Sequence, residues 1–221
     1  MRLLYRAGMD RHYSPIDHLL INFDQALRTV FGRPLVTGRA NPADAAPETE
    51  LSDRERTASA RMMRINHTGE VCAQALYQGQ ALTARLDAVR DGMAQAAQEE
   101  NDHLAWCEQR VEELGSHTSY LNPLFYAGSF SLGALAGAIG DKWSLGFVAE
   151  TERQVVEHLD GHLRRMASAD RKSRAILEQM KIDEQHHGTT ALEAGGAALP
   201  GPVKGLMRAM SKVMTGTTYW L

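Results

Sequence analysis

The sequence contains only two cysteines, Cys72 and Cys107, among its 221 residues. Two thiols cannot build a disulfide framework, so the chain is typical of a reducing compartment. Aromatic residues make up only 6% of the chain, and β-branched residues are few beside Ala, Leu, Met and Gln, which favours helix. There is also no basic excess, because 24 Lys and Arg stand against 27 Asp and Glu. This balance argues against a dedicated nucleic-acid-binding protein.

Two further patterns are missing. Residues 1–10 contain no continuous apolar stretch, so we expect no secretory signal. No segment shows sustained alternation of apolar and polar residues, so no sheet is predicted. What is present is a series of helical patterns separated by breaks that contain proline or glycine. Helices are predicted over residues 15–32, 52–82, 87–114, 124–140, 144–167, 170–193 and 203–214.

The stretch between the first two predicted helices is different in character. Residues 33–50 contain three prolines and little periodicity, which indicates a linker or long loop. We therefore expect an N-terminal helix with a Pro-rich linker over residues 1–51, followed by one domain over residues 52–221.

Two of the long helices carry the same pair of metal-binding side chains. Glu100 and His103 form a Glu-x-x-His motif, and Glu184 and His187 form a second one. Positions i and i+3 share one helix face, about 5–6 Å apart at Cβ, so both side chains can reach one metal centre. One such pair is common by chance. Two pairs on separate helices are typical of di-iron sites in helical bundles, which add one Glu from each of two further helices.

The two further glutamates are found one helix earlier in each case. Glu70 precedes Glu100 by 30 residues, and Glu152 precedes Glu184 by 32 residues. The chain therefore predicts two similar helical hairpins, in which the mid-helix positions face each other at one level. The duplicated spacing predicts a metal site made of Glu70, Glu100, His103, Glu152, Glu184 and His187.

Other histidines compete for the same role. His186 stands next to His187 and would pair with Asp183 at i, i+3, whereas Glu184 pairs with His187, which we prefer. His67 lies one turn before Glu70, and we interpret it as a supporting or capping residue.

Three more side chains are close to the motifs in sequence. His158 and His162 have the i, i+4 spacing that also suits a metal, but they lie off the face of Glu152, so we expect them to be exposed or to support the site. Glu150 is two residues from Glu152 and on another face. Cys107 follows His103 by one turn and is expected to behave as a small buried hydrophobe.

Taken together, these motifs resemble one known family, the demethoxyubiquinone hydroxylases, which are di-iron monooxygenases of ubiquinone biosynthesis. The resemblance covers nearly the whole chain. Combined with the helical pattern, it implies an all-α, ferritin-like four-helix bundle with an apolar crossover helix and additional N- and C-terminal helices. The segments that carry the resemblance are residues 65–70, 99–104, 150–152, 183–187 and 211–220.

The resemblance also implies an activity. The enzyme would hydroxylate the ring of a demethoxyubiquinol (2-polyprenyl-3-methyl-6-methoxy-1,4-benzoquinol) with O2, using two iron ions per chain. Glu70 and His103 would hold one ion, Glu152 and His187 the other, and the two Glu-x-x-His glutamates would bridge them. The family draws electrons from NADH, yet no G-x-G-x-x-G follows a strand, so no Rossmann site is expected. The implied partners are a long-chain prenylated quinol and other ubiquinone-biosynthesis proteins, and no nucleic acid.

A second class of protein could use the same six ligands, namely a ferritin- or rubrerythrin-like protein that binds iron or scavenges peroxide. The segment 124–140 argues against iron storage, because its seventeen residues carry no charge. As a helix it would cover about 25 Å. This length suits a crossover that lies along the bundle with an apolar outer face, on which we expect Leu132 to point outward.

The C-terminal region points to the same surface. No acidic residue follows Glu193, and basic residues recur every four positions opposite an apolar stripe, a pattern that suits an interfacial helix. We therefore expect a peripheral membrane protein on the cytoplasmic side of the inner (cell) membrane. The basic residues are Lys204, Arg208 and Lys212.

Overall fold

In the computed structural model, which describes residues 14–221, every predicted helix is present and no strand occurs within that range. Residues 1–13, on which the expectation of no secretory signal rests, lie outside it. The elements are α1 (Pro15–Phe31), the short 3-10 helix η1 (Pro42–Ala45), α2 (Asp53–Thr83), α3 (Asp87–Glu113), α4 (Asn122–Ile139), α5 (Asp141–Arg165), α6 (Arg171–Glu193) and α7 (Gly201–Thr218).

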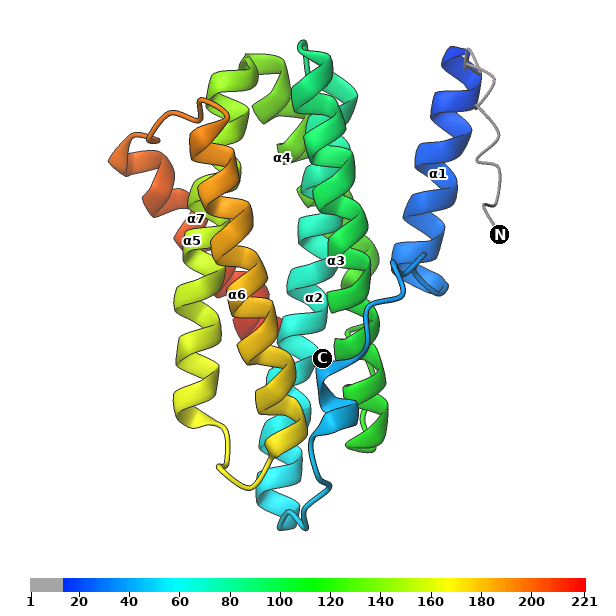
Figure 1. The fold of residues 1–221 in the computed structure, drawn as a ribbon, viewed down its shortest axis with the longest axis vertical. Coiled ribbons are helices and arrows are strands. Elements are labelled where there is room, and N and C mark those ends of the chain that lie inside the picture. Colours follow the sequence, from blue (N-terminus) through cyan, green and yellow to red (C-terminus); the bar gives the residue numbers. More distant parts are fainter. Residues whose placement is uncertain (1–13) are drawn as a thin grey trace, which may run out of the picture.

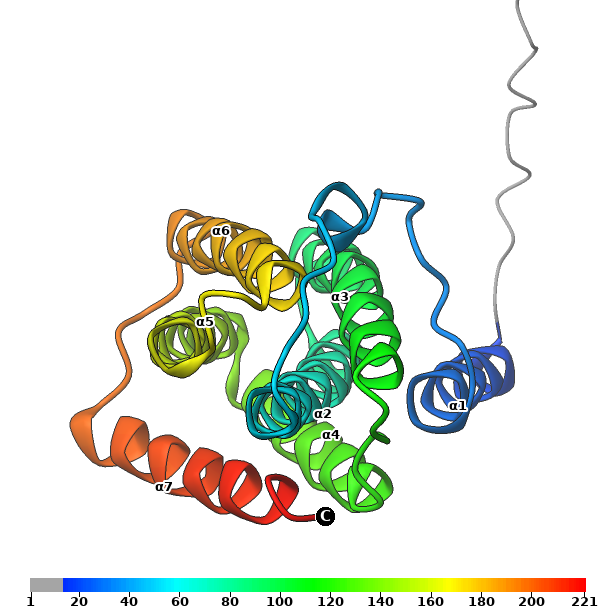
Figure 2. The same ribbon diagram turned by 90° about the horizontal axis from the view of Figure 1, so that it is seen from below.

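Four of these helices form a bundle. The hairpins α2–α3 and α5–α6 stand side by side, and the view along the bundle shows their four axes at the corners of a quadrilateral (Figures 1 and 2). Apolar side chains from all four helices pack together in one cluster and exclude water from this part of the interior. The all-α bundle predicted from the sequence is confirmed. The largest fully buried apolar side chains are Met63, Leu104, Leu159, Ile176, Leu177 and Met180.

Capping residues fix where several helices begin. The Ser52 hydroxyl accepts a hydrogen bond from the Glu55 N–H, and the Glu55 carboxylate accepts one from the Ser52 N–H. Asp170 caps α6 in a related way and also binds the Arg110 guanidinium at 2.8 Å, which ties α3 to the start of α6. These local contacts fix the first residues of α2 and α6, two of the helices that carry the predicted site.

The apolar segment forms α4, which packs along α2 and connects the two hairpins. Small residues make the close approach possible, because a Cβ added at Gly133 would overlap the backbone of Leu76, and one at Gly79 would overlap the backbone of Phe130. Gly140 then adopts φ +136°, a conformation that side chains rarely allow, and it separates α4 from α5. The predicted crossover is confirmed.

The residues of α4 that face outward differ from the expectation. Leu132 is only half-buried, whereas Leu124, Leu135 and Ile139 are the strongly exposed apolar residues of this helix. The reason is that the close contact with α2 runs through Gly133 and Gly137, and this contact turns the neighbouring Leu132 partly inward.

The Pro-rich stretch is a linker that crosses the bundle. Thr37 donates from its backbone N–H and its hydroxyl to the buried Asp102 carboxylate of α3, at 2.7 and 2.5 Å. Two residues further on, Arg39 donates to Asp183 of α6 at 2.6 Å. The linker therefore contacts α3 and α6 at the level of the predicted site, while the division into residues 1–51 and 52–221 stays a prediction.

Candidate metal centre

Three helices bring four of the predicted side chains together. Glu70 comes from α2, Glu100 and His103 from α3, and Glu184 from α6. All four are buried, and one ligand atom from each lies within 4.8 Å of those of the others. Residues separated by up to 114 positions along the chain thus form one compact group of donor atoms.

The imidazole of His103 faces the carboxylates with its Nδ1 atom. This nitrogen lies 2.9 Å from Glu100 Oε2, 3.2 Å from Glu184 Oε1 and 3.8 Å from Glu70 Oε2. It therefore points into the space that the three carboxylates enclose.

His187 approaches the same two central glutamates from the opposite hairpin. Its Nδ1 atom lies 3.1 Å from Glu100 Oε1 and 3.4 Å from Glu184 Oε2. Each of these carboxylates thus turns one oxygen toward His103 and the other toward His187. The adjacent His186 is exposed, in agreement with the helical phase inferred from the i, i+3 spacing.

Glu152 of α5 lies beside the compact group of Glu70, Glu100, His103 and Glu184 but is not part of it. It is buried, and its Oε1 accepts a hydrogen bond of 2.5 Å from the Tyr77 hydroxyl of α2. Tyr77 was not identified from the sequence, because an aromatic residue on a helix carries no signal of which side chain its hydroxyl will meet.

Two outer carboxylates, which the sequence motifs did not identify as part of the site, hold the imidazoles in place. Asp183 Oδ2 lies 2.9 Å from Nε2 of His103, and Glu99 Oε2 lies 2.8 Å from Nε2 of His187. Such a partner fixes the imidazole tautomer and raises its basicity at the other nitrogen. The signal was visible in the sequence, because each Glu-x-x-His motif is directly preceded by an acidic residue.

Burial and charge shift the pKa values in the group in opposite directions. Burial is the main cause that raises the pKa of Glu70 well above its ordinary value, and the carboxylates of Glu100 and Glu184 add to it. Burial and the charge of Glu184 do the same to Glu152. For His187, burial favours the neutral ring, but hydrogen bonds to Glu100 and Glu184 outweigh it and raise the pKa to about 12.

These shifts all reflect a shortage of positive charge. Four carboxylates are buried around two imidazoles, and among the described residues no Lys or Arg forms an ion pair with any of the four. Glu70 Oε2 has no hydrogen-bond partner, although buried carboxylate oxygens normally have one. A cation bound among the donors would remove both the charge imbalance and the unsatisfied oxygen, so the group fits a metal site.

The competing histidines form separate contacts. His67 is buried with Nδ1 3.4 Å from the Asn122 amide nitrogen, and burial lowers its pKa to about 4. His162, expected to be exposed or to support the site, is instead fully buried: its Nδ1 lies 3.0 Å from Asn66 Oδ1, and its ring contacts that of His158. Exposure of His162 was the wrong expectation because it compared this position only with the face of Glu152, whereas α5 also faces α2.

The two remaining candidates have their own contacts outside the donor group. Glu150 is paired with Arg153 at 2.6 Å and with Lys204 of α7 at 3.2 Å, as its position on another face suggested. Cys107 is buried and contacts the sulfur of Met180, so it packs as a small apolar side chain.

A four-helix bundle with one long crossover and a buried group of glutamates and histidines defines the ferritin-like class of helical metal proteins. The family model "Ubiquinone biosynthesis protein COQ7" matches residues 57–218, and the chain belongs to this family. The resemblance inferred from the sequence motifs is thereby confirmed.

Bacterial relatives align over nearly the full length. A protein of Nitrosococcus oceani is 63% identical over 211 residues, which cover 96% of this chain and 99% of the relative. A protein of Azotobacter vinelandii is 62% identical over 213 residues, covering 95% and 98%. One from Pseudomonas fluorescens Pf-5 is 61% identical over 212 residues, covering 95% and 97%. All three relatives bear the name 3-demethoxyubiquinol 3-hydroxylase.

Proposed function

We propose that this protein is a 3-demethoxyubiquinol 3-hydroxylase, a di-iron monooxygenase that uses O2 to hydroxylate the ring of a demethoxyubiquinol in ubiquinone biosynthesis. The observation that carries the proposal is the buried donor group of Glu70, Glu100, His103 and Glu184 in a chain of this family. The name shared by relatives with about 60% identity supports the choice of substrate.

The proposed ligands are the six residues of the duplicated motif. Glu70 and His103 would hold one iron ion, Glu152 and His187 the other, and the two central glutamates, Glu100 and Glu184, would bridge them. Their orientation supports this assignment, since each central carboxylate turns one oxygen toward each imidazole. Iron bound there supplies the redox chemistry with dioxygen that ring hydroxylation needs.

The chain's own residues prepare the centre for this chemistry. Asp183 and Glu99 hold the Nε2 atoms of the two histidines, so that Nδ1 of each ring stays available as a ligand. The Tyr77 hydroxyl donates to Glu152 and fixes the orientation of its carboxylate.

We propose that the substrate ring enters between α2 and α5, where a small cavity lies beside Glu152. The cavity has a volume of about 10 Å³ and is lined by residues of α2 and α5, among them Tyr77 and Val148. It holds no more than a water molecule, so a quinol would have to part these two helices to reach the centre. In Figure 2, α7 lies across the same side of the bundle, next to α2 and α5.

The lipid tail of the substrate accounts for the apolar outer face. The structure describes no helix long and apolar enough to cross a membrane. In Figure 2, α4 lies between α1 and α7 along one side of the bundle, and each of these three helices has exposed large apolar side chains. We propose that this face attaches the protein to the cytoplasmic side of the cell membrane. The strongly exposed residues include Phe23 and Phe31 of α1, Leu124, Leu135 and Ile139 of α4, and Leu206, Met210 and Val213 of α7.

The source of electrons is proposed to be NADH, as in the family that the sequence resembles. No strand is present between residues 14 and 221, so a nucleotide would bind without a Rossmann fold. Association with other ubiquinone-biosynthesis proteins stays a prediction.

The deciding experiment compares the quinones in lipid extracts of cells with and without the gene for this protein. Cells that lack it should accumulate the demethoxy precursor, and re-expression of the wild-type chain should restore ubiquinone. A variant in which Glu100 and Glu184 are both replaced by Ala should not restore it, and the wild-type protein should bind about two irons per chain, as bundle di-iron proteins do. If cells with and without the gene contain the same quinones, the proposed substrate is wrong. An iron content near zero would contradict the proposed di-iron centre.

A further inference from the structure

The Pro-rich linker contacts the bundle at the junction of α3 and α6. These two helices pack less closely against each other than against the partner helix of their own hairpins. Residues 35–39 of the linker bridge them beside the candidate metal centre. Their contacts are a hydrogen bond from the Asn101 amide to the Leu35 carbonyl oxygen at 3.1 Å, two from Thr37 to the Asp102 carboxylate at 2.7 and 2.5 Å, and one from Arg39 to Asp183 at 2.6 Å.

Arg39 contacts both side chains that hold the ring of His103. Asp183 Oδ2 lies 2.9 Å from Nε2 of His103 and accepts the hydrogen bond from the Arg39 guanidinium. The Trp106 ring lies 5.4 Å from the imidazole between centroids, and the Arg39 guanidinium lies over the same ring at 5.1 Å. An arginine that stacks on an aromatic ring and also pairs with a carboxylate has little rotational freedom. The orientation of the His103 ring is therefore coupled to the linker.

Asp102 depends on the linker for its hydrogen bonds. Its carboxylate is fully buried, and no Lys or Arg between positions 14 and 221 forms an ion pair with it. Within the same range, the hydrogen bonds that it accepts come from Thr37 alone. A buried carboxylate without hydrogen bonds is unfavourable. Detachment of Thr37 would therefore draw water in beside His103, which is the next residue of α3.

The other histidine of the centre has no such cover. Glu99, the carboxylate at Nε2 of His187, accepts a hydrogen bond from Gln95 of its own helix and pairs with no Lys or Arg of the described residues. Its side chain is 31% exposed, whereas that of Asp183 is 15% exposed. The two sides of the centre thus differ, because the linker covers the side of His103 and leaves the side of His187 partly open.

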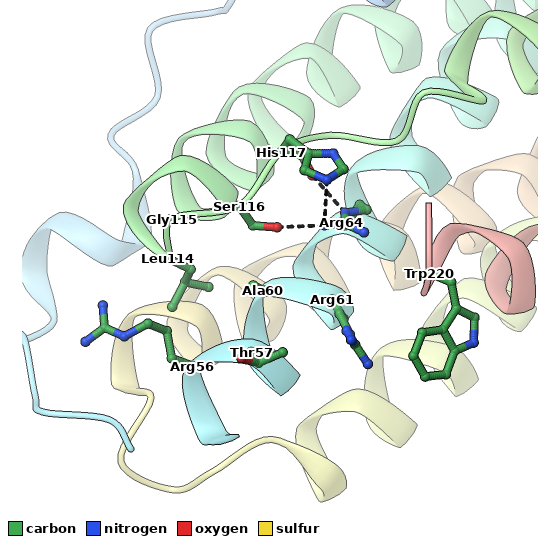
Figure 3. Close-up of a pocket in the computed structure, with 10 residues that line it drawn as sticks. All are labelled: Arg56, Thr57, Ala60, Arg61, Arg64, Leu114, Gly115, Ser116, His117 and Trp220. Atoms are coloured by element: carbon green, nitrogen blue, oxygen red, sulfur yellow. Dashed lines mark hydrogen bonds between the residues drawn. The ribbon is translucent and has the colours of Figure 1, made fainter. Parts of the chain in front are cut away.

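These contacts are separate from the cavity that Figure 3 shows. That cavity has a volume of about 390 Å³ and lies between the first half of α2, the loop after α3 and the end of α7. None of the residues that line it belongs to the linker. Residues 35–39 therefore cover the outer side of the metal centre and not this cavity.

We propose that residues 35–39 form a strap that slows the release of iron from the His103 side of the centre, with Thr37 and Arg39 as positioning residues. This inference rests on the proposed di-iron centre. While the strap is bound, Asp183 and Trp106 hold the imidazole toward the carboxylates, and the positive charge of Arg39 opposes the passage of a cation between α3 and α6. When the strap detaches, the ring is free to turn and water reaches the centre.

The test measures the rate of iron release and does not depend on hydroxylase activity. Iron-loaded protein is mixed anaerobically with excess ferrozine, and the ferrous complex is followed by its absorbance. The variants are Thr37→Val, which removes the hydroxyl, and Arg39→Gln, with Thr37→Ser as the conservative replacement. The matched control is Glu48→Gln, which removes the linker's ion pair with Lys172 of α6, twelve residues or about 18 Å along the helix from Glu184.

We expect iron to leave Thr37→Val and Arg39→Gln at least about tenfold faster than the wild type, because each variant loses a hydrogen bond to a charged group. Thr37→Ser and Glu48→Gln should release iron at the wild-type rate, and circular dichroism should show that all variants are folded. Hydrogen exchange reports on the strap without iron: the Thr37 N–H donates to Asp102, so it should exchange slowly in the wild type and faster in Arg39→Gln.

Two kinds of failure can be told apart. If the wild type binds iron but Thr37→Val and Arg39→Gln release it at the wild-type rate, or if Glu48→Gln accelerates release equally, the strap is overturned and the metal centre stands. If the wild type binds no iron, the proposed centre is wrong and the strap is overturned with it.

Discussion

Asp183 and His103 come from different hairpins of the bundle, and Asp183 Oδ2 lies 2.9 Å from Nε2 of His103. Glu99 and His187 repeat this relationship with the helices exchanged, at 2.8 Å. In both cases the acidic residue stands directly before the glutamate of its own Glu-x-x-His motif and reaches the histidine of the other motif. These two hydrogen-bonded pairs thus connect α3 and α6 on both sides of the centre. Arg39 of the linker binds Asp183 from outside the bundle.

Replacing Asp183 by Asn should weaken the centre without unfolding the bundle. The amide can still accept a hydrogen bond from His103 but no longer raises the basicity of the ring. We expect a loss of about 10–100-fold in iron affinity or hydroxylation rate, as for other carboxylates behind metal-bound histidines. Iron titration and turnover measure the effect. The control is Asp160→Asn, which removes only the ion pair with Lys181, and an Asp183→Asn protein with normal iron affinity and rate would contradict the proposed role.

The two adjacent histidines should respond differently to substitution. His187→Ala should abolish hydroxylation and lower the iron content, because the buried imidazole faces Glu100 and Glu184. His186→Ala should keep most of the activity, because this side chain is exposed. Turnover and metal analysis of the purified variants provide the comparison, and the reverse order of effects would mean that the register of α6 is shifted by one residue.

The contact between α2 and α4 depends on the absence of side chains. Gly133→Ala would push a methyl group into the backbone of Leu76, which should lower the free energy of unfolding by about 1–3 kcal/mol. Gly128→Ala on the same helix meets no neighbour and should instead stabilise the protein by about 0.5–1 kcal/mol. Urea unfolding of both variants shows whether the free energy of unfolding falls in Gly133→Ala and rises in Gly128→Ala. A Gly133→Ala protein as stable as the wild type would show that α4 can move away from α2.

Burial of His67 predicts a specific pH dependence. Its pKa is lowered to about 4 in the folded protein by desolvation, whereas an unfolded chain has a value near 6.5. As the pH falls from 6.5 toward 4, the unfolded chain binds a proton at His67 before the folded protein does, so the free energy of unfolding decreases. Between pH 7 and pH 5 this residue should lower the free energy of unfolding by about 2 kcal/mol.

Urea unfolding of the metal-free protein at both pH values tests this expectation. His67→Gln removes the titrating group, so its free energy of unfolding should fall less between pH 7 and 5 than that of the wild type. Equal decreases in the two proteins would mean that His67 is accessible to protons in the folded state.

A charge on the outer face of α4 should weaken membrane binding. Leu135 is 63% exposed on this face, and Leu135→Asp places a carboxylate where we propose lipid contact. The cost of about 2.5–3.5 kcal/mol on insertion scales corresponds to roughly a hundredfold weaker partitioning. The variant should keep its iron and still hydroxylate a short-tailed quinol in solution.

Vesicle co-sedimentation measures the binding, with Leu192→Asp as the control, since Leu192 is an exposed residue of α6 outside this face. Unchanged binding of Leu135→Asp would mean that the membrane surface lies elsewhere. A loss of similar size in Leu192→Asp would mean that the effect is one of net charge.

Much of the fold could be predicted from local signals. Helix starts follow from side chains that bond to their own backbone, such as Ser52 with Glu55, and these contacts involve residues only three positions apart. The duplicated Glu and Glu-x-x-His spacing placed Glu70, Glu100, His103 and Glu184 at one level, because rise per residue and hairpin geometry fix that level. The family also followed from these motifs.

What the tertiary structure decided is how the helices are rotated against one another. Periodicity shows which residues share a face of one helix, but it does not show which neighbour that face meets. The pairing of Asp183 with His103, the burial of His162 against Asn66 and the outward position of Leu135 instead of Leu132 all depend on this rotation. It is set by side-chain packing between helices far apart in the sequence, such as the backbone contact at Gly133, and no local pattern contains that information.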